Sequence, residues 1–484
     1  MACARSPGRR SLLAFVAALA ALALGAPTAM AADLGWSGVQ VLSSQGQPGT
    51  NPRLAVNAAG QAVIAWNETD AQGNSRVRVR FRQPGDNFAN PTGAFSDSGP
   101  VYASAAGASA SGASVAIDSN GNALVSWTRS GEVEVASGTP GGGLGSPQNL
   151  TPEAETASGG GVAMDPQGNA IVGWVRGSCC SGPKPRVQAR FKPAGGSFGA
   201  TTNVFDSATA PGVGAEPLLT SPLVAMDEQG NAAFAWAANL NSFNQDRFTY
   251  QIWAAYRPAG GSFEAAHSFP YAGGERSASP TSLAMRSGAT LLARDTDSAS
   301  DSRVIVNSRP PGGPWSDDNQ TLSEAPPSGE VNHSFGSQMA FDSSGNVLAT
   351  WSRSRQLEGG EIYESWRPAG ASGFDARKAI TPPTPPNGSP SFGFDQAGNA
   401  VMAWTRRGPL NSDTDQAIAT TRSPGRDGTL GALQPISAPG DFDQGRPALK
   451  VSSAGNAIAA WVRTPASGDN IVRTVEVREV LAAV

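Results

Sequence analysis

The segment SVAIDSNGNALVSW, from Ser114 to Trp127, contains two apolar runs separated by a turn rich in Asp, Gly and Asn. Such runs on either side of a Gly/Asn turn predict a tight β-hairpin, because Gly and Asn readily adopt the positive φ angles of these turns. Six further segments share the pattern, and in all seven the Trp lies nine residues after the position of Asp118. The other six segments end at Trp66, Trp174, Trp236, Trp351, Trp404 and Trp461.

An eighth, degenerate copy reads SLAMRSGATLLAR, with Arg286 in place of the Asp and Arg294 in place of the Trp. Each hairpin is followed by a third apolar run, such as RVRVRF or QIWAAY, and then by a second turn, which is RPAGGSF at its fullest (257–263). A short fourth run completes the copy, and successive copies start roughly 47 to 62 residues apart. Four antiparallel strands at this spacing are typical of a propeller blade.

We therefore predict an all-β fold, a single β-propeller of eight four-stranded antiparallel blades. Seven blades is the alternative if the degenerate copy is not a blade, but eight is favoured because that copy keeps all four strands. The last copy ends after its third strand, and residues 33–48 resemble a fourth strand that would complete it and remove exposed sheet edges. The predicted blades span 51–100, 101–155, 156–215, 216–278, 279–328, 329–385, 386–437 and 438–484 plus 33–48.

The first 31 residues have the features of an export signal. Three Arg precede an apolar run from Leu12 to Leu24, and the small residues Ala29-Met30-Ala31 suit cleavage. The run is too short to span a bilayer. We expect residues 32–484 to form a secreted, periplasmic or cell-surface propeller that has no membrane span and is a monomer. This part of the chain has 32 basic and 39 acidic residues, which argues against a nucleic-acid partner.

Antiparallel strand order places the loops of each copy on two opposite rims. The turns from first to second and from third to fourth strand share one rim, and they are short and similar in every copy. The loops from second to third strand lie on the other rim and differ in every copy. Divergent loops on a rigid scaffold commonly carry function, so we expect a binding surface on the variable rim.

The combination of an apolar strand, DxxGNA, a second strand ending in Trp, and RPxGGxF resembles a repeat of exported bacterial β-propeller proteins. Copies in that family are of the type VAxDxxGNAxxxW. The hairpin is also distantly similar to the NHL propeller repeat, in which an acidic residue stands where this chain has Trp. The resemblance covers nearly all of the chain after the signal, and it implies a secreted β-propeller without implying an activity.

The repeated Asp and Trp residues each allow two interpretations. The Asp residues could ring one rim with carboxylates, but Asn57 and Ser452 occupy the same position, and Asp, Asn and Ser all cap turns. Turn capping is therefore favoured. The Trp residues could stack on sugars if exposed, but burial between blades is favoured. The Asp positions are Asp118, Asp165, Asp227, Asp342 and Asp395.

Arginine recurs two residues after the Trp, where the chain enters the variable rim. Guanidinium groups repeated around one rim could grip a carboxylate, sulfate or phosphate in bidentate fashion. The alternative is that each pairs with a neighbouring acid or stacks on a Trp of an adjacent blade. The candidate ligand-binding residues are Arg129, Arg176, Arg353, Arg406 and Arg463.

Disulfide, metal and cofactor chemistry have little support. Cys179 and Cys180 are adjacent, so a bond between them would be strained, but an oxidising exterior favours this bridge as a loop clamp. Zinc is not expected, because no other Cys follows the signal and the chain has only two His. The acid-rich loops 295–302 and 411–416 could bind Ca²⁺, but they lack the Gly and closing Glu of a known calcium loop. We expect no cofactor.

These features favour a binding module over an enzyme, with a glycan or protein at the cell exterior as the partner. An anionic glycan suits the repeated Arg. The alternative is a sialidase-like glycoside hydrolase or lyase, although the S-x-D-x-G-x-T-W box of sialidases differs from the spacing found here. A more remote alternative is a quinoprotein dehydrogenase, whose A-x-D-x-x-T-G-x-x-x-W motif also has different spacings.

Overall fold

The strands of this protein pair almost entirely in antiparallel fashion. The computed structural model describes residues 34–83, 101–102, 109–152, 155–177, 183–210, 217–239, 250–270, 277–297, 301–324, 332–355, 360–408, 415–438, 442–443, 445–464 and 473–480. Within these ranges every regular element is a β-strand, and no helix is present. The predicted all-β, antiparallel fold class is confirmed. The same ranges contain no helix of the length and apolar character needed to cross a bilayer.

The strands form groups of four or five, which we number as units 1–8 in chain order. Unit 1 contains β2 (Gly49–Val56), β3 (Ala62–Thr69), β4 (Ser75–Arg82) and β5 (Val101–Tyr102). Unit 2 contains β6 (Ala110–Ile117), β7 (Ala123–Arg129), β8 (Glu132–Thr139), β9 (Gly143–Leu144) and β10 (Gln148–Asn149). Unit 3 contains β11 (Ala157–Met164), β12 (Ala170–Arg176), β13 (Arg186–Lys192) and β14 (Thr202–Asp206). Unit 4 contains β15 (Leu223–Met226), β16 (Ala232–Asn239), β17 (Tyr250–Arg257) and β18 (His267–Ser268).

The second half of the chain repeats this arrangement. Unit 5 contains β19 (Ser277–Arg286), β20 (Ala289–Asp297), β21 (Asp301–Arg309) and β22 (Gln320–Thr321). Unit 6 contains β23 (Asn332–Phe341), β24 (Val347–Arg355), β25 (Gly360–Arg367) and β26 (Lys378–Ala379). Unit 7 contains β27 (Ser391–Phe394), β28 (Ala400–Arg406), β29 (Gln416–Arg422) and β30 (Gln434–Pro435). Unit 8 contains β31 (Phe442–Asp443), β32 (Ala448–Val451), β33 (Ala457–Thr464) and β34 (Thr474–Val480), together with β1 (Gln40–Val41).

Each unit is one sheet, except that units 5 and 6 are joined by a short parallel pairing of β21 with β23. The degenerate copy, unit 5, keeps four strands as expected. Its hairpin turns through Ser287 and Gly288, with φ angles of 47° and 81°. The N-terminal strand β1 pairs with β34, with Gln40 opposite Val477. The N-terminal segment therefore supplies the outer strand of the last sheet.

The sheets pack on one another through buried apolar clusters. One cluster joins Ile171 and Val187 of unit 3 to Phe234 and Trp236 of unit 4. A corresponding cluster joins units 8 and 1, where Trp66 packs with residues of β33 and β34. All seven repeated Trp are at most 3% exposed, which confirms that they are core residues.

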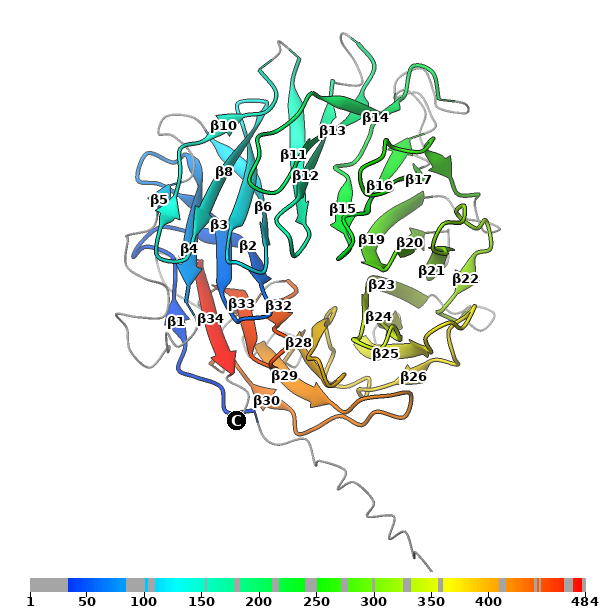
Figure 1. The fold of residues 1–484 in the computed structure, drawn as a ribbon. Helices are drawn as coiled ribbons and strands as arrows, with labels where there is room; N and C mark the ends of the chain where they lie inside the picture. The colour runs from blue at the N-terminus through cyan, green and yellow to red at the C-terminus, as the bar shows by residue number, and fades with distance from the viewer. Residues whose placement is uncertain are drawn as a thin grey trace, which may run out of the picture.

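The eight units follow one another around a common centre, with their first strands innermost (Figure 1). Each first strand contacts the first strand of the next unit, and β32 of unit 8 contacts β2 of unit 1. The hairpin turns are also linked from unit to unit. Ser119 N donates to Pro166 O at 3.1 Å, and Ser453 Oγ of unit 8 donates to Ala58 O of unit 1 at 3.3 Å. The first and last units are thus in direct contact.

Candidate functional site

The repeated Asp residues cap the hairpin turns. Asp118 Oδ1 accepts hydrogen bonds from the backbone N of Asn120 and Asn122 at 2.9 and 2.8 Å. Its other oxygen accepts from the Asn122 side chain at 2.7 Å. In unit 1, Asn57 Oδ1 accepts the equivalent bond from Gln61 N at 3.0 Å. The predicted turn-capping role is confirmed, and these carboxylates are buried in scaffold turns, except that of Asp395, which is half-buried.

The Asn of the hairpin turn binds the second turn of the same unit. Asn169 Oδ1 accepts from Ala194 N at 3.0 Å, and Asn231 Oδ1 accepts from Ala259 N at 2.9 Å. The DxxGN and RPxGG motifs recur together because the Asn side chain of the first motif connects the two turns. Gly121 has φ of 85°, the conformation that requires glycine at this position. This rim is stabilised as a scaffold.

The Arg two residues after the Trp shares a partner with that Trp in units 2 and 8. In unit 2, Trp127 Nε1 donates to Glu134 at 2.7 Å, and Arg129 forms an ion pair with the same carboxylate. In unit 8, Trp461 Nε1 donates to Glu476 at 3.2 Å, and Arg463 pairs with that Glu at 3.1 Å. In both units the Glu lies directly opposite the Trp on the neighbouring strand. The indole and the guanidinium therefore share one buried carboxylate.

Unit 1 has the same network with its charges exchanged. Here Glu68 follows the Trp by two residues and accepts from Trp66 Nε1 at 3.1 Å. Arg78, opposite Trp66 on β4, pairs with Glu68 at 3.3 Å. A ligand-binding ring would need the same charge at each position, whereas an internal pair needs only opposite charges. The exchange favours a structural role for the paired Arg.

Of the other three candidate Arg, Arg176 shares an amide rather than a carboxylate with its Trp, because Trp174 Nε1 donates to Gln188 Oε1 at 3.2 Å, whereas Arg353 and Arg406 lie in different surroundings. Arg176 is 1% exposed and donates to Gln188 Oε1 and Glu155 O, both at 2.9 Å. Arg353 is 4% exposed and donates to Tyr363 Oη at 3.2 Å. Arg406 is half-buried at the end of β28. Among the contacts of the described residues given above, Arg129, Arg176, Arg353 and Arg463 each have partners of their own, and ligand binding by the set of five stays a prediction.

The cysteine and calcium predictions fall largely outside the described ranges. Cys179 and Cys180 lie there, as do 298–300 and 411–414 of the two acid-rich loops. Where side chains are described, no three His, Cys, Asp or Glu residues lie close enough to hold a metal ion. Asp295 is described, and its carboxylate faces the neighbouring unit.

A cavity of about 420 Å³ lies where the first strands of units 1, 6, 7 and 8 approach one another. Three cationic residues line it: Arg53 on β2, Arg446 just before β32, and Lys450 on β32. Its remaining lining includes Asn51, Gln338 and Ser391. Volumes of this size suit small ligands. The cavity combines positive charge with hydrogen-bonding side chains.

One of these cations is held by unit 6, opposite a carboxylate of unit 5. Arg446 Nη2 donates to Gly336 O, while Asp295 accepts from Gly336 N at 2.5 Å and from Ser337 Oγ at 2.7 Å. Burial raises the pKa of Asp295 to about 6, against the effect of these hydrogen bonds and of the Arg446 charge. Burial also lowers the pKa of Arg446, which the charge of Asp295 partly offsets.

The other two cations are available to a ligand. Arg53 and Lys450 both reach solvent, and no acidic partner of either is found among the described residues. The cavity walls around Lys450 displace water and lower its pKa. The sequence signal for this site was the charged residue in the otherwise apolar first strands NPRLAV and PALKV. The sequence alone did not indicate this site, because its cations lie in different copies of the repeat and approach one another only in the folded chain.

Comparison with known proteins gives only distant likenesses. No family model and no curated protein sequence matches the chain. Among solved structures, the polysaccharide lyase Uly1 has a TM-score of 0.43 and 11% identity, covering 75% of this chain and 88% of that one. A puromycin hydrolase has a TM-score of 0.45 and 13% identity, covering 87% and 59%. The NanB sialidase of Streptococcus pneumoniae, as its K499G mutant, has a TM-score of 0.38 and 8% identity, covering 92% and 98%. Likenesses at this level do not bear on what this chain binds.

Proposed function

We propose that this chain is an exported, single eight-bladed β-propeller that acts as a binding module for an anionic glycan. The eight-bladed interpretation is supported by eight consecutive units of four or five strands, each packed on the next, and by contacts between units 8 and 1. The pairing of β1 with β34 supports closure of the last blade by the N-terminal strand. Export rests on the signal-like residues 1–31, and the monomeric state is part of the same proposal.

The observation that carries the binding proposal is the cationic cavity between the first strands. The whole chain has a net charge of −4, so Arg53, Arg446 and Lys450 are a local concentration of the opposite sign. The nearby carboxylate of Asp295 already accepts hydrogen bonds from Gly336 N, Ser337 Oγ and Thr281 Oγ1. An incoming carboxylate or sulfate would find Lys450 and Arg53 as charge-assisted donors.

An acidic sugar suits this lining better than a simple inorganic ion. The uronic acid carboxylate would face Lys450 and Arg53, and the sugar hydroxyls would bond to Asn51, Gln338 and Ser391 around the same cavity. Charge-assisted hydrogen bonds are worth about 1.5–3 kcal/mol each, enough to set specificity for the acid. No step of bond cleavage is part of the proposal.

Titration calorimetry with trigalacturonate tests this directly. Replacing Lys450 by Gln or Arg53 by Gln should weaken binding at least about tenfold, since each removes one charge-assisted bond. Lys378→Gln is the matched control, because Lys378 is exposed on the outer strand β26, away from the cavity. Binding to wild type should also weaken as salt concentration rises.

Three results would count against the proposal. Equal affinity of wild type and Lys450→Gln would exclude the cavity as the site. Release of unsaturated or newly reducing products from the trisaccharide would replace the binding module with a lyase or hydrolase. Loss of binding in a variant with Ala at both Arg176 and Arg406, without loss at Lys450→Gln, would move the site to the variable rim.

A further inference from the structure

A guanidinium at the end of the third strand stacks on an aromatic ring of the preceding unit at several junctions. Arg257 of unit 4 lies 4.3 Å from the ring centre of Phe191 in unit 3. Arg309 of unit 5 lies 3.5 Å from Tyr256 in unit 4. Arg422 of unit 7 lies 5.3 Å from Trp366 in unit 6. Such contacts fill the cleft between two units near the scaffold turns.

The junction of units 5 and 6 lacks the ring. Strand register places Ser308, opposite Leu291, at the position that Phe191 occupies opposite Ile171 in unit 3. Arg367 ends β25 as Arg257 ends β17, so its expected partner is missing. The cavity here is about 580 Å³, against about 400 Å³ for the corresponding cavity between units 3 and 4.

Two further polar groups line the same cavity. Thr290 is fully buried, and its Oγ1 has no hydrogen-bond partner in the described structure. The seven equivalent positions in the other units are all apolar: Ala62, Ala123, Ala170, Ala232, Val347, Ala400 and Ala457. Arg367 donates from Nε to Ala371 O at 2.7 Å, and no acidic partner for it is found in the described structure. Burial lowers its pKa.

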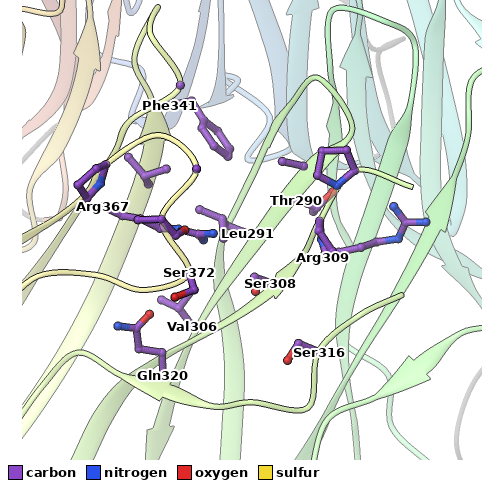
Figure 2. Close-up of a pocket in the computed structure, with 18 of the residues that line it drawn as sticks. Thr290, Leu291, Val306, Ser308, Arg309, Ser316, Gln320, Phe341, Arg367 and Ser372 are labelled. Carbon is purple, nitrogen blue, oxygen red and sulfur yellow. The ribbon is translucent and has the colours of Figure 1, made fainter. Parts of the chain in front are cut away.

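The cavity has an apolar wall on one side, and polar and charged side chains line the rest. Leu291, Val306 and Phe341 form the apolar part of the lining, whereas Ser316, Asp318 and Gln320 line the cavity with polar groups, and Figure 2 shows Arg367 extending toward Leu291. Arg309 points away from it in the same view, toward its partners Tyr256 and Glu264. Arg367 is therefore the guanidinium that remains available for a ligand.

We propose that this cleft, lined by Thr290, Leu291, Val306, Ser308, Phe341 and Arg367, binds a small aromatic acid. The ring takes the place of the missing aromatic side chain, between the apolar wall and the guanidinium plane. The carboxylate accepts hydrogen bonds from the free nitrogens of Arg367 and from the hydroxyl of Ser308. This ligand fills the vacant ring position and pairs with the charge of Arg367. The site is separate from the cationic cavity between first strands.

The test uses 4-hydroxyphenylacetate as the probe, with saturation-transfer NMR and calorimetry on the full chain. Ser308→Phe should refill the cleft, raise the melting temperature and weaken binding more than tenfold. Arg367→Met keeps an apolar stem and should also weaken binding at least tenfold, while wild type should bind 4-hydroxyphenylacetamide at least tenfold more weakly than the acid. Arg257→Met, in the cleft that Phe191 fills, is the matched control and should bind as wild type does.

Each alternative result is decisive. Absence of saturation transfer to wild type, or equal binding by wild type and Ser308→Phe, would exclude the cleft. Equal binding of the acid and the amide, with no effect of Arg367→Met, would overturn the acid as the ligand class. Because Lys450→Gln should leave this binding unchanged, failure here is distinguishable from failure of the proposed glycan site.

Discussion

The contact between the first and last units provides a test of ring closure. Arg82 of unit 1 and Glu479 of unit 8 form a bidentate ion pair, with Nε–Oε2 and Nη2–Oε1 distances both of 2.5 Å. Both side chains are 2% exposed, and Arg82 Nη1 also donates to Gly60 O at 2.6 Å. Glu479→Gln keeps the shape of the side chain but leaves Arg82 as a buried charge with no counter-charge from residue 479.

Breaking one partner of a buried pair typically costs about 3–5 kcal/mol, because the remaining charge stays desolvated. We expect a loss of this size in the free energy of unfolding, measured by urea denaturation. The control is Glu364→Gln, which breaks another buried pair between units, with Arg422, in which Nε–Oε2 is 2.8 Å, between the sequence-adjacent units 6 and 7. Its cost should be similar, again about 3–5 kcal/mol.

A second control gives the loss of unfolding free energy that is expected when an exposed ion pair is broken. Asp375→Asn removes the partner of Arg426, whose side chain is 65% exposed, and should cost less than about 1 kcal/mol. A loss of less than about 1 kcal/mol for Glu479→Gln, beside a large loss for Glu364→Gln, would refute the reasoning. Units 1 and 8 would then not be held together in solution.

Three other predictions follow from single sites. Asp118→Ala removes three hydrogen bonds from one turn and should cost about 1–3 kcal/mol in thermal unfolding, whereas Asp118→Asn should cost less than about 1 kcal/mol, because Asn57 caps the same turn in unit 1. Glu134→Gln should cost about 1.5–3 kcal/mol, and a matching loss in near-ultraviolet circular dichroism would report the altered Trp127. The raised pKa of Asp295 disfavours its ionised form in the folded state, so its stabilising contribution is present below about pH 4 and is lost as pH rises through about 6. The stability of wild type relative to Asp295→Asn should therefore fall by about 3 kcal/mol between pH 4 and pH 7.5 in urea titrations, and a flat difference would contradict the assignment.

Much of the fold was predictable because the repeat is local in sequence. The hairpin, its capping Asp and the buried Trp lie within fourteen residues, so a single copy such as 114–127 contains the residues that determine its structure. The N-terminal strand could be assigned to the last unit because the last copy lacks a fourth strand. The pairing of Arg129 with a carboxylate was anticipated as an alternative to ligand binding.

The two cavities were not predicted, because each depends on residues from different copies. Arg53 and Lys450 approach one another only when units 1 and 8 are adjacent in space. The cleft of Arg367 becomes visible only when third strands are aligned by register, which sets Ser308 of RVIVNSR against Phe191 of RVQARFK. The Ser at this position is visible in the sequence. Its significance depends on the Arg of the next unit, which stacks on the aromatic ring at the corresponding position, and this contact is seen only in the folded structure.

The pairing of β1 with β34 also constrains how the protein can be made. The sheet of unit 8 takes strands from both ends of the chain, so its last edge can form only after residue 480 has emerged. Until then, the chain exposes the unpaired edge of β33, which is a template for association with other chains. A truncation that removes β34 would therefore deprive β1 of its partner as well, and we expect such a product to aggregate during biogenesis rather than persist as a ring with one strand missing.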